Sequence, residues 1–415
     1  MTDMDLIPQP HFGERLRRLR QQRGMKQADL ADSGLSASYI SRIESGNRAV
    51  TPHVAHVLAE RLGVEIGAFQ SSREAYLAQQ LADAQASLAT GNHRAAAEAF
   101  EAALAQAAGA PLATAWLIRH SLGLALANLG RLADWRRYQT ELVALATDAG
   151  SADLLTQAQT GLSNCLRLSG DIAEAYAAAR AARDRSRDPD VEPGHRILAT
   201  IALIAAESET GRAADATRRA EELLGLLDEQ TPAPLRAQAL WAAASTYVAR
   251  GRHDEAMALL VKAINELPSG EDVVTWARLR LAVVSLGDRA GAPMDDVACE
   301  WYREAAHVLR LTAIPIYQIQ LEVVEARIAL DKGRNAEAKE RSETALARAE
   351  LLSFRDHART QMLWAQATAR TGEPDRAIAE LRAVAQRLDE AGARDLSAEA
   401  WRLVAELALT ERGNA

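Results

Sequence analysis

The sequence predicts an all-α protein in which a short N-terminal helical domain is followed by an α-solenoid of about eight helical hairpins. Two observations support this prediction. Residues 27–48 have the pattern of two short helices joined by a glycine turn. Downstream, glycines recur every 39 to 42 residues, at positions 91, 130, 170, 211, 251, 291, 333 and 372, each between two helix-like stretches. We therefore expect three segments, namely residues 1–70, residues 73–391 and a C-terminal capping helix at 392–415.

The first domain should contain five short helices. The spacing of Phe12, Leu16 and Leu19 gives the first helix one apolar face. Thr51 followed by Pro52 is a typical helix start, and it predicts a capped fourth helix. The apolar faces of these helices would form a shared core.

The stretch 27–48 carries the candidate site. Gly34 separates its two helices, because glycine adopts the positive φ that a tight turn needs. Ser36 caps the second helix, whose Ile40 and Ile43 share one face. The opposite face is small and polar, and it consists of Ala37, Ser38, Ser41 and Arg42. Such a face fits the major groove of DNA.

Over about residues 12 to 70 the chain resembles the phage-repressor-like helix-turn-helix of the XRE family. The residues that carry the match are Gln27, Leu30-Ala31, Gly34, Ser36, Ile40 and Ile43-Glu44-Ser45-Gly46-Asn47. The resemblance implies a lambda-repressor-like domain that binds double-stranded DNA. It favours a homodimer on an inverted-repeat operator.

The resemblance also assigns DNA contacts residue by residue. Gln27 should touch phosphate and base edges, and Arg42 is the best candidate for a guanine contact. Ala37 and Ser38 hold reading positions but are short, so DNA shape should contribute to specificity. The other expected DNA contacts are Ser36, Ser41 and, on the phosphates, Arg17, Arg18, Arg20, Asn47 and Arg48. The alternative is a motif kept only for dimerisation, which the intact polar face disfavours.

Charge is distributed unevenly along the chain. The 415 residues are 48% apolar and carry a net charge of −8, whereas residues 1–70 hold 9 Lys/Arg against 8 Asp/Glu. Six basic residues and one acid lie between Gly13 and Lys26. The DNA footprint should therefore be confined to the first domain, because the acidic remainder repels DNA.

The sequence predicts no enzyme, no cofactor and no metal site. It contains no phosphate-binding glycine loop and no nucleophile elbow. His53 and His56 lie three residues apart with Glu60 beyond, a pattern more typical of a solvated or DNA-proximal helix face than of a ligand set. Cys165 and Cys299 lie far apart, which favours a reduced, cytoplasmic chain, and no run is long and apolar enough for a membrane span.

Small residues flank each turn of the repeats. Five residues past the glycine stand Ala96, Ala175, Ala216, Ala256, Ala338 and Ala377, and seven before it stand Ala84, Gly123, Ser163, Ala244, Ala326 and Ala365. Two small positions let antiparallel helices approach closely. This pattern resembles tetratricopeptide repeats, although the period is nearer 40 than 34, Trp135 replaces an alanine, and repeat six has two extra turn residues before Ala298. HEAT-type repeats are the alternative, which the fixed glycine and alanine disfavour.

In tetratricopeptide repeats the first helix of each hairpin lines a concave groove. By this resemblance the ligand-binding residues would be Gln157, Asn164, Gln238, Trp241, Arg278, Gln320, Arg327, Arg359 and Gln366. Amides can pair with both backbone groups of an extended peptide, and arginine can hold its carboxylate. The alternative is a solvated inner face that binds nothing small.

Two functional classes fit these predictions. The combination resembles the peptide-sensing quorum regulators, in which a helix-turn-helix domain precedes tetratricopeptide repeats; they are homodimers controlled by a short peptide. The alternative is an adaptor whose solenoid docks a protein partner and whose DNA-binding domain localises it. The seam between the two domains, at residues 70–73, is too short for a free linker.

Overall fold

The structure is a computed structural model that describes residues 6–7, 9–31, 34–69, 73–289, 296–312 and 314–414. Over these ranges the regular secondary structure consists of α- and 3-10 helices, with no β-strand. The predicted all-α fold is therefore confirmed. The chain divides into two compact units, one of Met1–Ala86 with Ala99–Ala108 and one of Ser87–Glu98 with Gly109–Ala415. The predicted domain boundary at residues 70–73 stays a prediction, because residues 70–72 lie outside the described residues.

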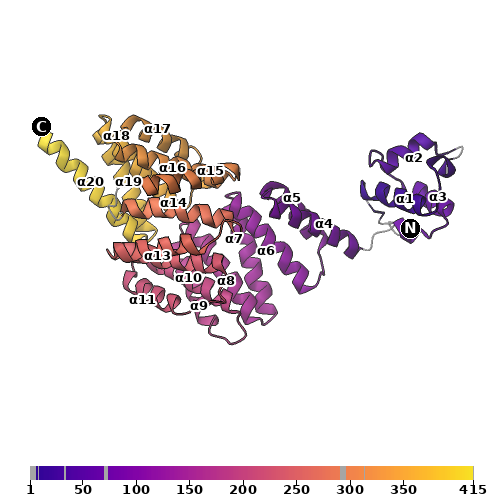
Figure 1. Ribbon diagram of the computed structural model, residues 1–415, viewed down its shortest axis with the longest axis horizontal. Coiled ribbons are helices and arrows are strands. Elements are labelled where there is room, and N and C mark those ends of the chain that lie inside the picture. The colour runs from indigo at the N-terminus through magenta and orange to yellow at the C-terminus, as the bar shows by residue number, and fades with distance from the viewer. Residues whose placement is uncertain are drawn as a thin grey trace. The chain divides into compact units, whose positions relative to one another are not determined.

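The first unit begins with five short helices (Figure 1). They are α1 (His11–Gln22), η1 (Gln27–Leu30), α2 (Ala37–Glu44), α3 (Pro52–Leu62) and η2 (Ile66–Phe69). The two η segments are single 3-10 turns, so the first helix of the predicted motif is shorter than an α-helix. The φ of Gly34 depends on residue 33, which lies outside the described residues, and it stays a prediction.

The apolar faces of these helices meet in one core. Phe12 and Leu16 of α1 and Ile40 and Ile43 of α2 are 0% exposed. The ring of Phe12 stacks on Phe69 of η2, with ring centroids 4.7 Å apart. Burial of these faces stabilises the domain at roughly 25 cal/mol per Å² of apolar surface.

Both predicted helix caps are present. The Ser36 hydroxyl accepts a hydrogen bond from the Tyr39 N–H at 3.1 Å. The Thr51 hydroxyl accepts one from the Val54 N–H at 3.3 Å, and Pro52 opens the helix. Each cap pairs an N–H that the first helical turn leaves without an intrahelical partner.

The second unit is a stack of helical hairpins in chain order (Figure 1). Its hairpins are α6 (Leu112–Asn128) with α7 (Leu132–Asp148), α8 (Ala152–Ser169) with α9 (Ile172–Arg185), α10 (Pro193–Glu209) with α11 (Ala213–Leu224), α12 (Ala233–Ala249) with α13 (His253–Glu266), α14 (Val273–Arg289) with α15 (Asp296–Leu311), α16 (Pro315–Asp331) with α17 (Asn335–Leu346), and α18 (Phe354–Arg370) with α19 (Pro374–Glu390). The 3-10 helix η3 (Ala349–Leu351) precedes α18, and α20 (Arg394–Asn414) ends the chain. The pair α4 (Arg73–Ala89) and α5 (His93–Gln106) is divided between the two units. The predicted solenoid of hairpins is confirmed.

The recurring glycines form the turns inside the hairpins. At the turn positions 91, 130, 170, 211, 251, 333 and 372 the glycine φ lies between +72° and +99°, and Gly291 lies outside the described residues. In one such turn the Asp171 N–H donates to the Leu166 carbonyl at 2.9 Å, and an equivalent bond closes each of the other six. This is the Schellman helix end, which needs a left-handed residue and so favours glycine.

The small residues on both sides of each turn are buried as predicted. The six alanines past the turn, from Ala96 to Ala377, are each 0% exposed. In the hairpin of α8 and α9 the Ser163 hydroxyl donates to the Ala175 carbonyl at 2.9 Å, which joins the two small positions directly. The two helices of a hairpin therefore approach closely at these positions.

Trp135 on α7 departs from the alanine pattern, and Gly123 on α6 accommodates it. A Cβ added at Gly123 would lie 3.1 Å from Cδ1 of Trp135. The indole therefore occupies space that a side chain on α6 would fill. This hairpin exchanges the small and large positions while keeping the helices close.

Hairpins far apart in the sequence also meet within the second unit. Helix α8 contacts α18, and α10 contacts α20. Arg355 of α18 lies 3.5 Å from the Glu209 carboxylate of α10 and donates to Asp395 of α20 at 3.1 Å. These contacts close the unit on itself, a feature that the repeat period does not predict.

Candidate nucleic-acid interface and ligand groove

Helix α2 presents the predicted polar face to solvent. Ser38, Ser41 and Arg42 are exposed, Ala37 is half-buried, and the capping Ser36 is exposed. Within the described part of the chain, the guanidinium of Arg42 makes no hydrogen bond or ion pair, so its donors are available to a ligand. A solvent-facing arginine on a rigid helix is suited to a bidentate contact with guanine.

A buried ion pair holds this helix on its scaffold. Arg20 of α1 donates to both carboxylate oxygens of Glu44 on α2, at 2.6 and 2.9 Å, and to the Met25 carbonyl at 2.8 Å. The side chains of Arg20 and Glu44 are only 11% and 4% exposed. Burial raises the pKa of Glu44, but the hydrogen bonds from Arg20 and Gln27 and the positive charges of Arg20 and Arg17 together outweigh it, and the net pKa is lowered.

Two predicted DNA contacts belong to this network. Arg20 was expected on the phosphates, but in this structure its guanidinium donates to Glu44 and to the Met25 carbonyl inside the domain, so a phosphate contact by Arg20 stays a prediction. Gln27 is half-buried and donates to Glu44 at 2.8 Å, so in this structure its amide nitrogen faces the scaffold. A DNA contact by Gln27 stays a prediction and would have to use its amide oxygen or a rotated side chain.

Sequence reasoning missed the residues that fix the angle between α1 and α2. A Cβ added at Gly13 would lie 2.0 Å from the Ile43 carbonyl oxygen, so only glycine fits this crossing. The Gln9 amide donates to the Ile43 and Arg48 carbonyls at 3.2 and 2.6 Å, and its oxygen accepts from the Gly13 N–H at 3.1 Å. A lone glycine inside a helix of charged residues was the available signal.

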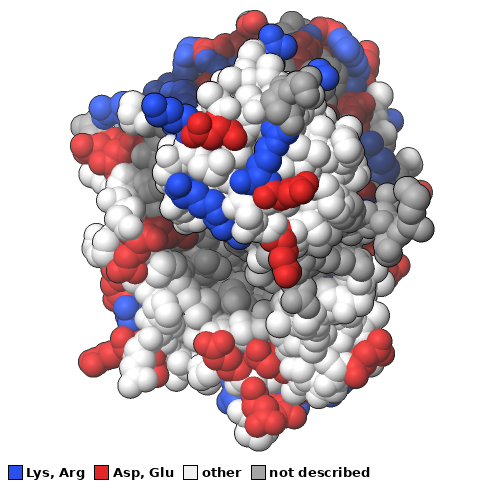
Figure 2. Space-filling model, turned by 90° about the vertical axis from the view of Figure 1, so that its right-hand side faces the viewer, with Lys and Arg blue, Asp and Glu red and all other residues white. Residues whose placement is uncertain are grey.

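The remaining predicted phosphate contacts are exposed. Arg17 and Arg18 lie on the solvent face of α1, and Asn47 and Arg48 follow α2. The Arg48 guanidinium lies 5.3 Å from the ring centroid of Tyr39, which orients it. On the face shown in Figure 2, basic side chains gather in small groups among acidic and uncharged ones. On this face the positive charge is therefore local.

The predicted groove residues lie on the first helices of their hairpins and are all partly buried. They are Gln157 and Asn164 on α8, Gln238 and Trp241 on α12, Arg278 on α14, Gln320 and Arg327 on α16, and Arg359 and Gln366 on α18. Their role in ligand binding stays a prediction. The structure does show which of them lie together and which are already bonded within the protein.

Trp241, Arg278 and the neighbouring Tyr317 lie together. The Arg278 guanidinium is 5.2 Å from the ring centroid of Trp241 and 6.0 Å from that of Tyr317. Three consecutive first helices, α12, α14 and α16, contribute to this group. Tyr317, which is 8% exposed, was not among the predicted residues.

Other predicted groove residues already have protein partners. Gln157 donates to Asp153 at 3.0 Å, and Asp153 also contacts the His195 ring nitrogen at 2.7 Å. Arg327 lies 3.3 Å from Asp331 one turn further along α16. A ligand would have to displace or extend these contacts.

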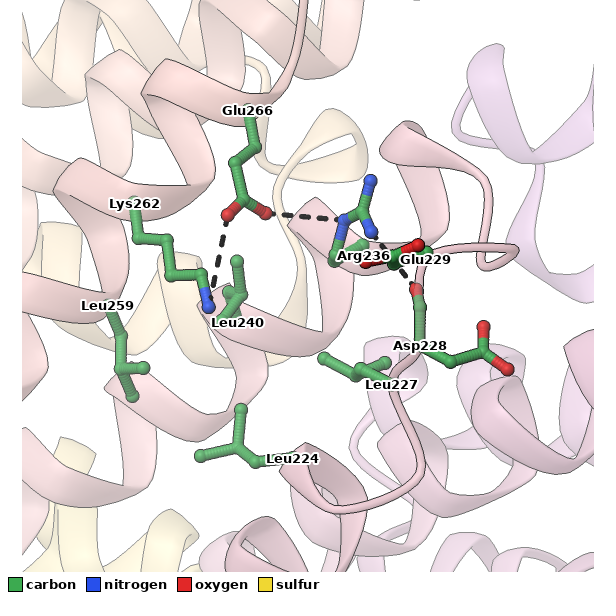
Figure 3. A pocket seen from close by; sticks show the side chains of 9 residues that line it. All are labelled: Leu224, Leu227, Asp228, Glu229, Arg236, Leu240, Leu259, Lys262 and Glu266. Carbon is green, nitrogen blue, oxygen red and sulfur yellow. Dashed lines mark hydrogen bonds and ion pairs between the residues drawn. The ribbon is translucent and has the colours of Figure 1, made fainter.

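A shallow pocket lies on a different part of the second unit. It has a volume of about 340 Å³ and is lined by side chains from α11 to α13 and the loop between α11 and α12. Figure 3 shows Glu266 between Arg236 and Lys262, at 3.2 and 3.8 Å, above a floor of leucines. It contains none of the predicted groove residues.

Over the described residues no group of three or more His, Cys, Asp or Glu is arranged to hold a metal ion. No helix in the same ranges has both the length and the apolar character needed to cross a membrane. Burial raises the pKa of the Cys165 thiol to about 11, so this cysteine is an unreactive packing residue at neutral pH.

The fold and the exposed face of α2 define a DNA-binding domain of the helix-turn-helix class. Residues 11–68 match the family described as helix-turn-helix domain. The chain is 42% identical over 72 residues to the HTH-type transcriptional regulator PrpR of Mycobacterium tuberculosis (strain ATCC 25618 / H37Rv). That match covers 17% of this chain and 15% of PrpR, so it concerns the N-terminal domain alone.

Solved structures resemble the repeats in fold. A Rap protein complexed with competence and sporulation factor is 12% identical, with a TM-score of 0.50 over 83% of this chain and 99% of that one. The apo form of the quorum sensor NprR from B. thuringiensis is 13% identical over 96% of this chain and 97% of that one, with a TM-score of 0.47. The likeness to the Rap protein supports the helical-repeat fold, whereas the TM-score with NprR is too low to support an argument.

Proposed function

We propose that the chain is a sequence-specific DNA-binding transcription regulator of the cytoplasm, whose helical repeats bind a short peptide or other small ligand that modulates operator binding. The observation that carries this proposal is the exposed polar face of α2, with Arg42 unpaired among the described residues on a helix-turn-helix domain. Arg42 is the one long side chain on that face, so a single domain reads few bases. We infer a homodimer on an inverted repeat, with half-sites about 34 Å apart.

The ligand half of the proposal rests on the partly buried polar residues of the first helices. Amide and guanidinium groups on consecutive hairpins can bind an extended peptide. A ligand there would act by binding one curvature of the repeats more tightly than another. The coupling free energy between ligand binding and operator binding should be about 1–3 kcal/mol. An adaptor that docks a protein partner is the alternative function.

Selection from a pool of random double-stranded DNA tests the DNA half. The full chain should enrich sequences with two symmetric half-sites, and a pool that stays random would overturn the proposal. Mass spectrometry of molecules that co-purify with the chain tests the ligand half. A bound peptide or small molecule supports the sensor, whereas a stoichiometric protein partner supports the adaptor.

A further inference from the structure

The shallow pocket lined by α11, α12 and α13 has charged groups at its rim that lack hydrogen-bond partners (Figure 3). The Glu266 carboxylate lies 3.2 Å from Nε of Arg236 and 3.8 Å from the Lys262 ammonium. In the described part of the chain, however, neither Oε2 of Glu266 nor Nε of Arg236 makes a hydrogen bond, and both atoms are buried. The charges are therefore close but misaligned. They have lost water without full compensation, so a ligand that pairs with them binds favourably.

A second ion pair on the same hairpin has aligned hydrogen bonds. Arg252 donates to the two carboxylate oxygens of Glu255 at 2.8 and 2.6 Å. The side chains of this pair are 33% and 57% exposed, whereas those of Arg236 and Glu266 are 25% and 35% exposed. The more buried pair thus lacks the hydrogen bonds that a purely structural ion pair of its burial needs.

The floor of the pocket is aliphatic. It consists of four leucines, namely Leu224, Leu227, Leu240 and Leu259. Leu240 is buried and the other three are partly exposed, so an apolar group placed on them would lose contact with water. The volume of about 340 Å³ lies at the lower end of the range for small-ligand sites. An apolar floor with a few polar groups at the rim is the usual composition of such sites.

The charges of the lining are balanced. Arg236 and Lys262 supply two positive charges, and Glu266 and the exposed Glu229 supply two negative ones. The remaining charged residue is Asp228, whose carboxylate accepts hydrogen bonds within its own loop and points away from the leucines in Figure 3. A simple anion or cation would be attracted by one half of the rim and repelled by the other. A ligand that carries both charges gains from both halves.

We propose that this pocket binds a free aliphatic amino acid such as leucine. The ammonium of the ligand donates to Glu266, its carboxylate accepts from Arg236 and Lys262, and its side chain covers the leucines of the floor. The rim and the floor thus recognise the two charges and the apolar side chain separately. Because the pocket contains none of the predicted groove residues, this site is additional to the function proposed above.

The test titrates the full chain with four compounds by isothermal titration calorimetry. They are leucine, 4-methylpentanoate, which lacks the ammonium, 3-methylbutylamine, which lacks the carboxylate, and alanine, which lacks the isopropyl group. Leucine should bind roughly ten- to a hundredfold more tightly than either singly charged compound, the usual value of a hydrogen bond to a charged group. Alanine should bind about tenfold more weakly than leucine, because it covers less of the pocket floor.

Glu266→Gln tests the ammonium contact, and Glu255→Gln on the same helix is the matched control. Without the charge of Glu266 the rim has a net positive charge, so 4-methylpentanoate should bind at least as tightly as leucine. Glu255→Gln should keep the preference of the natural chain, and the melting temperature of each variant confirms that it folds.

Three results would each overturn this site. They are binding of none of the four compounds, equal affinity of the natural chain for leucine and 4-methylpentanoate, and an unchanged preference for leucine in Glu266→Gln. None of them affects the selection of DNA, so the regulator function is tested separately.

Discussion

A Cβ added at Gly170 would lie 2.6 Å from Cδ2 of Phe354, closer than such atoms approach in proteins. Gly170 is the turn between α8 and α9, whereas Phe354 is the first residue of α18. The turn of the preceding hairpin behaves similarly, because a Cβ at Gly130 would lie 3.0 Å from the Leu351 side chain. Glycine serves here both to form the turn and to let a distant hairpin approach it.

Charged groups complete this closure of the second unit. The Glu209 side chain is 5% exposed and is paired with Arg167 at 3.1 Å and Arg355 at 3.5 Å. Burial raises the pKa of Asp395, but the hydrogen bonds and positive charge of Arg355, the Leu396 N–H and the charge of Arg359 together lower it below its usual value. Buried charges of this kind are stable only when every partner is in place. The closure therefore depends on the relative position of α8, α10, α18 and α20.

Gly170→Ala should destabilise the second unit more than Gly251→Ala does. Both glycines have positive φ, so each alanine costs about 1 kcal/mol of backbone strain. Only at Gly170 must the new methyl displace Phe354, which should cost about 1–3 kcal/mol more. Unfolding midpoints in denaturant measure the difference, and hydrogen exchange should locate it in α8 and α18.

Gly251 is the appropriate control because a Cβ there would meet nothing within 4 Å. If the two variants unfold at the same midpoint and α18 keeps its exchange protection, α8 and α18 do not pack against each other in solution.

Local signals made the turns and the close helix pairs predictable. A left-handed helix end selects glycine wherever it occurs, so the 39- to 42-residue period is visible in the residues themselves. The alanines past each turn follow because two helices must nearly touch there. Trp135 broke the pattern, and its explanation required Gly123 on the partner helix.

Contacts between distant segments were not predictable in the same way. Arg20 has the sequence context of a phosphate-binding residue, but its partner Glu44 lies on another helix, and only the fold brings them together. Gly13 opposite the Ile43 carbonyl is a second example. The close approach of Phe354 to Gly170 produces no periodic pattern in the sequence. Among the predicted groove residues, position in the repeat indicated Trp241 and Arg278, but not Tyr317 beside them.

Glu44→Gln should destabilise the helix-turn-helix domain at neutral pH and remove part of its acid sensitivity. The folded-state pKa of Glu44 is lowered, so its contribution is complete above the unfolded value of about 4.3 and is lost as pH falls through the folded pKa. Leaving Arg20 without its buried partner should cost roughly 3 kcal/mol at pH 7. Hydrogen exchange of the α1 and α2 amides in the full chain, measured as a function of pH, reports both the loss of stability at neutral pH and the change in acid sensitivity.

Glu60→Gln, which alters an exposed carboxylate on α3, is the control for this experiment. The natural chain and Glu44→Gln should converge in protection only once the pH has fallen below the folded-state pKa of Glu44, which lies below its usual value. A constant difference between them at all pH values would show that the charge of Glu44 contributes nothing.

Arg42→Ala and Arg18→Ala should affect DNA binding in different ways. Arg42 faces solvent on α2, so its loss should cost about 1–3 kcal/mol on the selected operator and relax the preference at one base pair. Arg18 on α1 should contact phosphate, so its loss should weaken all sequences alike and reduce the salt slope by about one. Titrations of operator and random DNA at several salt concentrations separate the two roles, and an equal loss on both DNAs by both variants would contradict them.

Ala256→Leu should overpack the contact between α12 and α13. Ala256 and the facing Ala244 are both 0% exposed, and the helices approach at these two positions, so three added carbons have no space to enter. The cost should be about 1–3 kcal/mol. Each hairpin is stabilised mainly by its neighbours, so the loss of exchange protection should spread to α10 and α14. Val261→Leu on the same helix, at a position 36% exposed, adds one carbon at the surface and should leave the melting temperature unchanged. If Ala256→Leu melts with the natural chain and leaves protection in α10 and α14 intact, close approach of small residues is not what holds these hairpins together.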